Sequence, residues 1–124
     1  MKLLFVHRAF PGQFVNLIKP LRSRGDYIIA LGENNLVNSK QQALADKFIG
    51  YEVLKGNTPN IPAGLLDVES KVLRAKAAAK SLEKYIDNGL NPDLIITHSG
   101  WGESIFLGHI FPNIPQIHFL EYYY

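Results

Sequence analysis

The sequence contains no cysteine, so disulfide bonds and zinc sites built on thiolates are excluded. The four histidines are not spaced like paired metal ligands on one helix; they are His7, His98, His109 and His118. We therefore expect neither a metal ion nor a cofactor.

Long hydrophobic runs are also missing. After Lys2 the first apolar run covers only residues 3–6, which is shorter than the core of about 7–15 residues in a secretory signal. No stretch approaches the roughly 20 apolar residues of a membrane-spanning helix. These absences predict a cytoplasmic location.

Neither sign of charge is in large excess. The chain has 13 lysines and arginines against 11 aspartates and glutamates, and its formal net charge is +2. The basic residues are dispersed and do not alternate with aromatic residues along one stripe. We therefore expect no nucleic-acid partner, because such binding requires a concentrated basic surface.

The remaining composition is that of a folded domain. Of the 124 residues, 47% are hydrophobic and 19% are charged. A chain of this length forms one domain that buries roughly two thirds of its unfolded surface. We predict a single domain over residues 1–124.

Apolar and amphipathic segments alternate along the chain. Apolar runs typical of buried strands occupy residues 2–7, 27–32, 48–54, 93–97 and 116–120. Helical patterns occupy residues 13–24, 39–45 (the weakest), 66–88 and 103–111. Pro20 should kink or shorten the first helix. This order predicts an α/β fold with a Rossmann-like parallel sheet and helices on both of its faces.

The longest predicted helix has the clearest pattern. Apolar residues recur at alternating spacings of three and four along it: Leu65, Val68, Val72, Ala75, Ala79, Leu82 and Ile86. Such a seam favours a helix packed on the sheet over a coiled-coil partner. Gly89 is suited to end the helix.

The turn after the first strand lacks a dinucleotide-binding fingerprint. The glycines of G-x-G-x-x-G would fall on His7, Ala9 and Gly12, and only the last is glycine. Glu33 stands near the place of the ribose-binding acid, but one glycine and one acid make NAD a poor candidate. The N–H groups of Gly12 and Gln13 lie near a helix start, where anions bind readily; the alternative is a plain turn.

The turn after the fourth predicted strand is the strongest candidate site, because strand carboxyl ends hold the ligands of open α/β sheets. His98 lies at such an end, where its imidazole either enters the crevice and donates to a substrate or is structural. Gly100 and Gly102 allow close backbone approach. Trp101 either stacks on a sugar or packs on the loop, and Glu103 either binds a sugar hydroxyl or only begins a helix.

A serine hydrolase is disfavoured at the same turn. Ser99 would be the nucleophile of a G-x-S-x-G elbow, but Thr97 and Trp101 stand where the sharp turn needs glycine. Too few residues follow Ser99 for the later aspartate and histidine of that fold.

Two turns and the end of the chain together resemble family 4 glycosyltransferases. The matching segments are MKLLFVHRAFPGQF at 1–14, PDLIITHSGWGES at 92–104 and FLEYY at 119–123. The resemblance implies the N-terminal half of a GT-B enzyme, in which two Rossmann-like domains face each other across a cleft. Such an enzyme, here of hexosyltransferase type, moves a sugar from a nucleotide-sugar donor to an acceptor and retains the anomeric configuration.

The resemblance also assigns residues. In this family the first domain mainly shapes the acceptor side, its first loop approaches the donor diphosphate, and a histidine after a later strand approaches the donor sugar. These roles carry over to Gly12 and His98, and His98 is the candidate catalytic residue. The further candidates for substrate binding are Gln13, Gly100, Trp101 and Glu103.

The donor-binding half of such an enzyme is not expected in this chain. The family's second domain carries two glutamates separated by seven residues, a spacing that no two glutamates here have. We expect a domain truncated at its C-terminal end and inactive alone, with a nucleotide-sugar donor, an unknown acceptor and the missing domain as partners. A second copy of the chain is a further candidate partner, at the exposed tyrosine end. A membrane surface is a candidate partner only if the acceptor is a lipid. The alternative is a stand-alone α/β ligand-binding or interaction module without catalysis.

Overall fold

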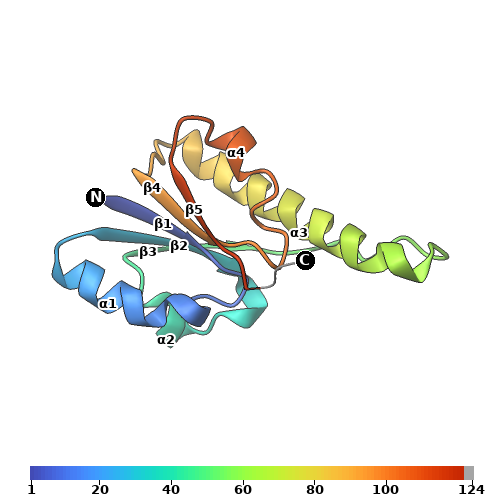
Figure 1. The fold of residues 1–124 in the computed structure, drawn as a ribbon, viewed down its shortest axis with the longest axis horizontal. Helices are drawn as coiled ribbons and strands as arrows, with labels where there is room; N and C mark the ends of the chain where they lie inside the picture. The colour runs from blue at the N-terminus through green and yellow to red at the C-terminus, as the bar shows by residue number, and fades with distance from the viewer. Residues whose placement is uncertain (122–124) are drawn as a thin grey trace.

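Five parallel strands form one sheet in the computed structural model, which describes residues 1–121 (Figure 1). The strands are β1 (Lys2–Val6), β2 (Tyr27–Glu33), β3 (Lys47–Tyr51), β4 (Leu94–His98) and β5 (Gln116–Phe119). Their order across the sheet is β3-β2-β1-β4-β5, and every neighbouring pair is parallel. All five carboxyl ends therefore lie at the same edge.

Helices cover both faces of the sheet, which confirms the predicted α/β, Rossmann-like architecture (Figure 1). The helical segments are η1 (Gly12–Phe14), α1 (Val15–Ser23), η2 (Asn34–Leu36), α2 (Ser39–Gln42), α3 (Ala63–Ile86) and α4 (Leu107–Ile110). The α1 and α2 helices lie on one side, and α3 and α4 lie on the other. The α1 helix passes through Pro20, so the proline does not end it.

Strand β1 shows why the strands have continuous apolar sequences. Leu3 and Phe5 point into the core that includes Ile18 of α1, whereas Leu4 and Val6 point into the core that includes Leu82 of α3. A strand buried on both faces has no polar side, because successive residues alternate between the two cores.

Several predicted elements are shorter in the structure, among them the helix predicted over 39–45, which is only α2 (Ser39–Gln42). Strand β3 ends at Tyr51 and not at residue 54, and Leu54 is 90% exposed beyond it. The helix predicted over 103–111 is reduced to the single turn of α4, because the chain around Gly102, with φ +109°, forms successive turns instead. Gly25 and Gly89, both with φ +98°, follow α1 and α3 and support the predicted helix ends.

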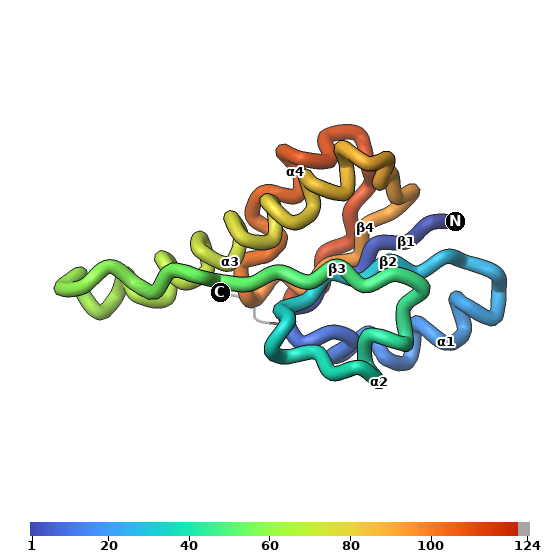
Figure 2. The backbone as a smooth tube through the Cα atoms, turned by 180° about the vertical axis from the view of Figure 1, so that it is seen from behind, coloured from blue at the N-terminus to red at the C-terminus, as the bar shows by residue number. Residues whose placement is uncertain are grey.

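The α3 helix extends well beyond the carboxyl edge of the sheet (Figure 2). Its buried residues, Ala75, Ala78 and Leu82, lie in the second half of the helix. Leu65 and Val68, the first members of the predicted seam, are 52% and 56% exposed. The prediction that the whole seam packs on the sheet is therefore wrong for its first half, because no strand lies beneath it.

Within residues 1–121, no helix is both long and apolar enough to cross a bilayer. The tyrosines at 122–124, at which we expect contact with a second copy, lie outside the described residues.

Candidate functional site

The carboxyl ends of β1 and β4 lie side by side and bring two histidines together. Val6, the last residue of β1, pairs with Thr97 of β4, so His7 and His98 become neighbours. Their ring centroids are 5.0 Å apart, and the residues are only 6% and 1% exposed. The His98 imidazole is thus enclosed at the edge of the sheet and does not stand open in a crevice.

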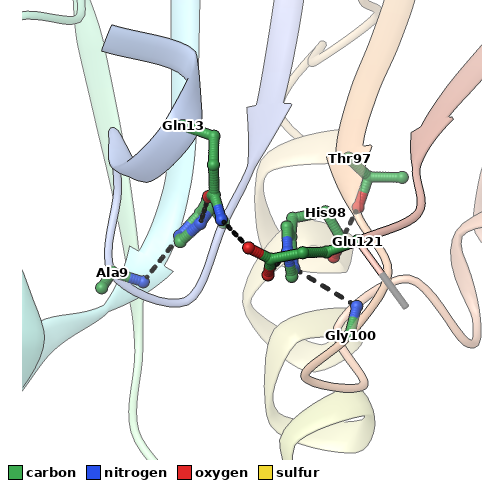
Figure 3. A network of polar contacts seen from close by, with 7 residues as sticks. Ala9, Gln13, Thr97, His98, Gly100 and Glu121 are labelled. Atoms are coloured by element: carbon green, nitrogen blue, oxygen red, sulfur yellow. Dashed lines mark hydrogen bonds and ion pairs between the residues drawn. The ribbon is translucent and has the colours of Figure 1, made fainter.

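Glu121, which follows β5, links the two histidines with the help of Gln13 (Figure 3). The Gln13 Oε1 atom lies 2.6 Å from His7 Nε2, and Gln13 Nε2 donates to Glu121 Oε1 at 3.3 Å. The other carboxylate oxygen of Glu121 lies 3.2 Å from His98 Nε2. Four side chains from opposite ends of the sequence therefore form one continuous polar network.

Backbone N–H groups fix the tautomer of both rings. Ala9 donates to His7 Nδ1 at 3.0 Å, and Gly100 donates to His98 Nδ1 at 3.3 Å. Because Nδ1 accepts in each ring, a neutral ring carries its hydrogen on Nε2. Each histidine therefore donates from Nε2 to its side-chain partner.

Burial sets the charge state of His7. Desolvation lowers its pKa from the ordinary value of 6.5, and the neighbouring His98 lowers it further. The hydrogen bond to Gln13 raises this pKa but does not reverse the net direction. His7 is therefore neutral near pH 7.

Gly12 and Gly100 allow the two loops to close on the imidazoles. A Cβ atom on Gly12, where φ is +49°, would lie 2.2 Å from His7 Nε2. A Cβ atom on Gly100 would lie 2.8 Å from His98 Cε1. At both positions a ring occupies the space that a side chain would need. The anion-binding role of the Gly12 and Gln13 amides stays a prediction.

Trp101 joins this network to the neighbouring loops. Its ring stacks on His98 with an interplanar angle of 26°, and the Arg8 guanidinium lies 5.5 Å from its centroid. Arg74 Nε donates to the Trp101 carbonyl at 2.6 Å. The tryptophan thus packs against His98 and Arg8 and is still 41% exposed, and its stacking on a sugar stays a prediction.

Glu103 is buried in a turn and does not lie in the first turn of a helix, because α4 begins only at Leu107. The Tyr51 hydroxyl donates to its Oε1 at 2.5 Å, while Oε2 has no hydrogen-bond partner among the described residues. Burial raises the pKa of the Glu103 carboxyl and of the Tyr51 hydroxyl. Contact between Glu103 and a sugar stays a prediction, and it requires the surrounding side chains to move.

The sequence suggests Glu33 only as a ribose-binding acid and does not reveal the group of charged residues to which it belongs at the same edge. They line a cleft of about 260 Å³ between the ends of β2 and β3 and the projecting part of α3: Arg8, Glu33, Lys55 and Arg74. Arg8 Nε donates to Glu33 Oε2 at 2.7 Å, so Glu33 is paired with an arginine. Arg8 could have been found as a charged residue directly after the first apolar run. Lys55 and Arg74 carry no such signal, because one lies in a loop and the other on a long helix.

Ser99 does meet a histidine in the structure. Its Oγ lies 2.8 Å from His118 Nδ1, and the other ring nitrogen of His118 lies 3.1 Å from Gln116 Oε1. An amide thus stands where a hydrolase triad has a carboxylate, and Trp101 still fills a position that the elbow needs to be glycine. Among residues 1–121, no three acidic or histidine side chains are grouped closely enough to hold a metal ion.

Comparison with known protein families gives a match over most of the chain. Residues 27–124, from β2 onward, match the glycosyl transferase family 4 group. The chain belongs to this family. No curated protein sequence matches it.

Solved glycosyltransferase structures share the fold of this family 4 chain. SsfS6, a glycosyltransferase of Streptomyces sp. SF2575, is similar with a TM-score of 0.65 and 17% sequence identity. The structure of SsfS6 in complex with thymidine diphosphate is similar with a TM-score of 0.60 and 18% sequence identity. Each alignment covers 95% of this chain and 38% of the other, so the family 4 chain spans well under half of those proteins. The expected resemblance to the N-terminal half of a GT-B glycosyltransferase is confirmed.

Proposed function

We propose that the chain is the acceptor-side domain of a retaining glycosyltransferase that moves a sugar from a nucleotide-sugar donor to an acceptor. The observation that carries this proposal is the network of His7, Gln13, Glu121 and His98 at the carboxyl edge of the sheet. This edge is where open α/β sheets bind their ligands. Imidazole, amide and carboxylate groups are suited to the hydroxyls of a sugar.

In the proposed enzyme, His98 donates from Nε2 to a hydroxyl of the donor sugar. That hydrogen points to Glu121, whose side chain is 43% exposed and therefore free to be displaced. A hydroxyl taking the place of the carboxylate would meet a ring already oriented by the Gly100 N–H. Orientation before binding lowers the entropic cost of ordering the site.

The donor side of the proposal rests on Gly12 and on the related fold. The N–H groups of Gly12 and Gln13 lie at the start of the helical segment η1–α1, where a diphosphate would be bound by backbone donors, although the His7 ring fills the space beside the Gly12 Cα. The solved glycosyltransferase SsfS6 has been obtained with thymidine diphosphate, which supports a nucleotide donor for this chain. Because the chain spans 38% of that protein, we assign most donor contacts to a second domain outside the 124 residues.

The first test is turnover by the isolated chain. Purified residues 1–124 are mixed with nucleotide sugars and a panel of acceptors, and released nucleoside diphosphate is measured. We expect no release, because half of the proposed cleft is missing. Turnover by the isolated chain would contradict the proposal.

The second test uses the whole reading frame that encodes this chain. We expect it to continue for about one more domain, with two glutamates separated by seven residues, and its product to turn over a nucleotide sugar. His98→Ala should then lower kcat by about 100-fold, the effect of removing one donor from a transferring centre. His109→Ala, at an exposed position on α4, should leave kcat unchanged. An unchanged kcat in His98→Ala refutes the role of His98, and a frame that ends at Tyr124 favours the non-catalytic module.

A further inference from the structure

The cleft beside the histidine network carries an excess of positive charge. Its charged side chains are those of Arg8, Lys55 and Arg74 against the single carboxylate of Glu33. It lies on the β2–β3 side of β1, whereas the histidine network lies on the β4–β5 side. The two features are therefore separate places on one edge of the sheet.

Both arginines are held in fixed positions. Arg8 Nε donates to Glu33 at 2.7 Å and its guanidinium lies against the Trp101 ring, while Arg74 Nε donates to the Trp101 carbonyl at 2.6 Å. Within residues 1–121, the hydrogen bonds of both guanidiniums use Nε only. The terminal nitrogens remain for another acceptor, and a pre-positioned guanidinium fork matches the paired oxygens of an oxyanion.

The nearby acidic groups do not neutralise this charge completely. Glu69 lies near Lys55, and the hydrogen bonds from the Thr58 hydroxyl and N–H at 2.6 Å lower its pKa and keep it charged. It does not line the cleft, and with Glu33 it makes two negative charges against three positive ones. Glu103 lies near the two arginines but is 1% exposed and does not line the cleft. The cleft is thus built to receive negative charge from outside.

We propose that the cleft formed by Arg8, Lys55 and Arg74 binds an oxyanion, of the phosphate class, that belongs to the acceptor substrate. That the anion is part of the acceptor rests on the function proposed above; that the cleft binds an anion does not. The donor is assigned to the other side of β1, where Gly12 and His98 lie. The acceptor would therefore be a phosphorylated molecule and not a neutral sugar.

The binding test uses inorganic phosphate and the isolated chain, labelled with ¹⁵N and studied by NMR at constant ionic strength. We expect saturable shifts of the Arg8, Gly56 and Asn57 amides and of the Arg74 Nε–H, with a dissociation constant on the order of millimolar. Chloride at equal ionic strength should give none of these shifts. Equal shifts with chloride would overturn the proposal.

Charge variants make this test specific. Lys55→Gln, at an exposed loop position, should weaken phosphate binding about fivefold, and Arg74→Lys should do so too, because it keeps the charge but loses the fork. Lys80→Gln makes the same charge change at an exposed position of α3 and should leave binding unchanged. Equal weakening by Lys80→Gln would show that only net charge matters, and would overturn the proposed site.

Two further ligands decide whether the anion belongs to the acceptor or the donor. Glucose 6-phosphate should shift the same cleft residues as inorganic phosphate. Thymidine diphosphate should instead shift Gly12 and Gln13. Binding of thymidine diphosphate at Lys55 and Arg74, more tightly than phosphate, would overturn the assignment to the acceptor. Because all of these are binding measurements, their outcome is independent of whether sugar transfer is ever observed.

Discussion

At the level of single residues, the charge of His7 is controlled by its surroundings. The ring is buried beside a second histidine, and its Nδ1 accepts a hydrogen bond from the Ala9 N–H. Protonation would break that bond, because both nitrogens of an imidazolium are donors. The bond from Ala9 therefore depends on a neutral ring at position 7, whereas the bond from Nε2 to Gln13 exists in either charge state.

This dependence predicts a loss of stability in mild acid. The pKa of His7 is lowered below its ordinary value of 6.5 in the folded chain. Between the folded pKa and 6.5, the unfolded chain therefore binds more protons than the folded chain. The contribution of neutral His7 to the free energy of unfolding is complete above about pH 6.5 and is lost as the pH falls through the folded pKa. Each tenfold difference in proton affinity between the folded and unfolded chains changes this free energy by about 1.4 kcal/mol. In urea unfolding from pH 7.5 to 5.0, His7→Asn should show a smaller loss than the unaltered chain. His109→Asn, on exposed α4, should keep the full loss; equal pH dependence in all three proteins would contradict the prediction.

Tyr51 and Glu103 form a second buried pair, and its chemistry gives an opposite pH dependence. Tyr51→Phe removes the donor to Glu103 Oε1, and we expect it to lower the free energy of unfolding by about 1–3 kcal/mol at pH 7.

Burial raises the pKa of Glu103, so its ionisation lowers the stability of the folded chain as the pH rises from about 4.5 through the folded pKa. Gln cannot ionise, so Glu103→Gln should not share this loss. Between pH 4 and pH 8, the melting temperature of the variant should therefore rise relative to that of the unaltered chain.

The matched control for this pair is Tyr27→Phe, at a half-exposed tyrosine of β2. It should change the free energy of unfolding by less than about 0.5 kcal/mol. If Tyr51→Phe cost no more than Tyr27→Phe, the buried hydrogen bond would contribute nothing to stability.

Residue-level prediction from the sequence succeeded where a residue's place depends on its neighbours in the chain. His98 could be placed at a strand end because it directly follows an apolar run, and Gly12 could be placed in the turn after the first strand. The partners of those residues could not be predicted. Glu121 lies 108 residues from Gln13, and their contact depends on the order of strands across the sheet.

At the level of elements, the turn between β4 and α4 depends on Gly102. Its φ is +109°, and a Cβ atom there would lie 2.4 Å from the carbonyl oxygen of Lys71 on α3. We expect Gly102→Ala to cost roughly 2–4 kcal/mol, because backbone atoms must move. Gly108→Ala, in α4 with open space around its Cβ, should be neutral or stabilise by up to about 1 kcal/mol. Equal free energies of unfolding for the two variants, measured in urea, would refute the contact with α3.

The two halves of α3 should respond differently to the same substitution. Leu82 is fully buried under the sheet, whereas Leu65 lies on the projecting half and is half exposed. Leu82→Ala should cost about 2–5 kcal/mol in urea unfolding, and Leu65→Ala less than about 1 kcal/mol. A similar cost for both would mean that the projecting half is packed in solution.

This difference marks what periodicity can and cannot predict. The spacing of the seam correctly predicted a long helix with one apolar side. It could not predict where the sheet ends, because that limit is set by the length of other strands. Similarly, the helix predicted over 103–111 was too long because the pattern does not register the positive φ of Gly102.

At the level of the whole molecule, the order of strands creates the site. β1 lies between β2 and β4, so its carboxyl end sits beside the charged cleft on one side and the second histidine on the other. Trp101 contacts both His98 and Arg8 and thereby connects the two features. The fold class followed from the alternation of elements, but the meeting of these residues required the three-dimensional order.

This connection predicts that the site and the sheet unfold together. Trp101 is the single tryptophan of the chain, so its fluorescence reports on the site, while far-ultraviolet circular dichroism reports on the helices and the sheet. Because the two cores share every central strand, we expect both signals to change at the same urea concentration in one cooperative transition. Ile18→Ala, in the core beneath α1, should shift both midpoints equally to lower urea. A fluorescence midpoint below that of circular dichroism would instead show that the edge carrying the histidines opens before the sheet does.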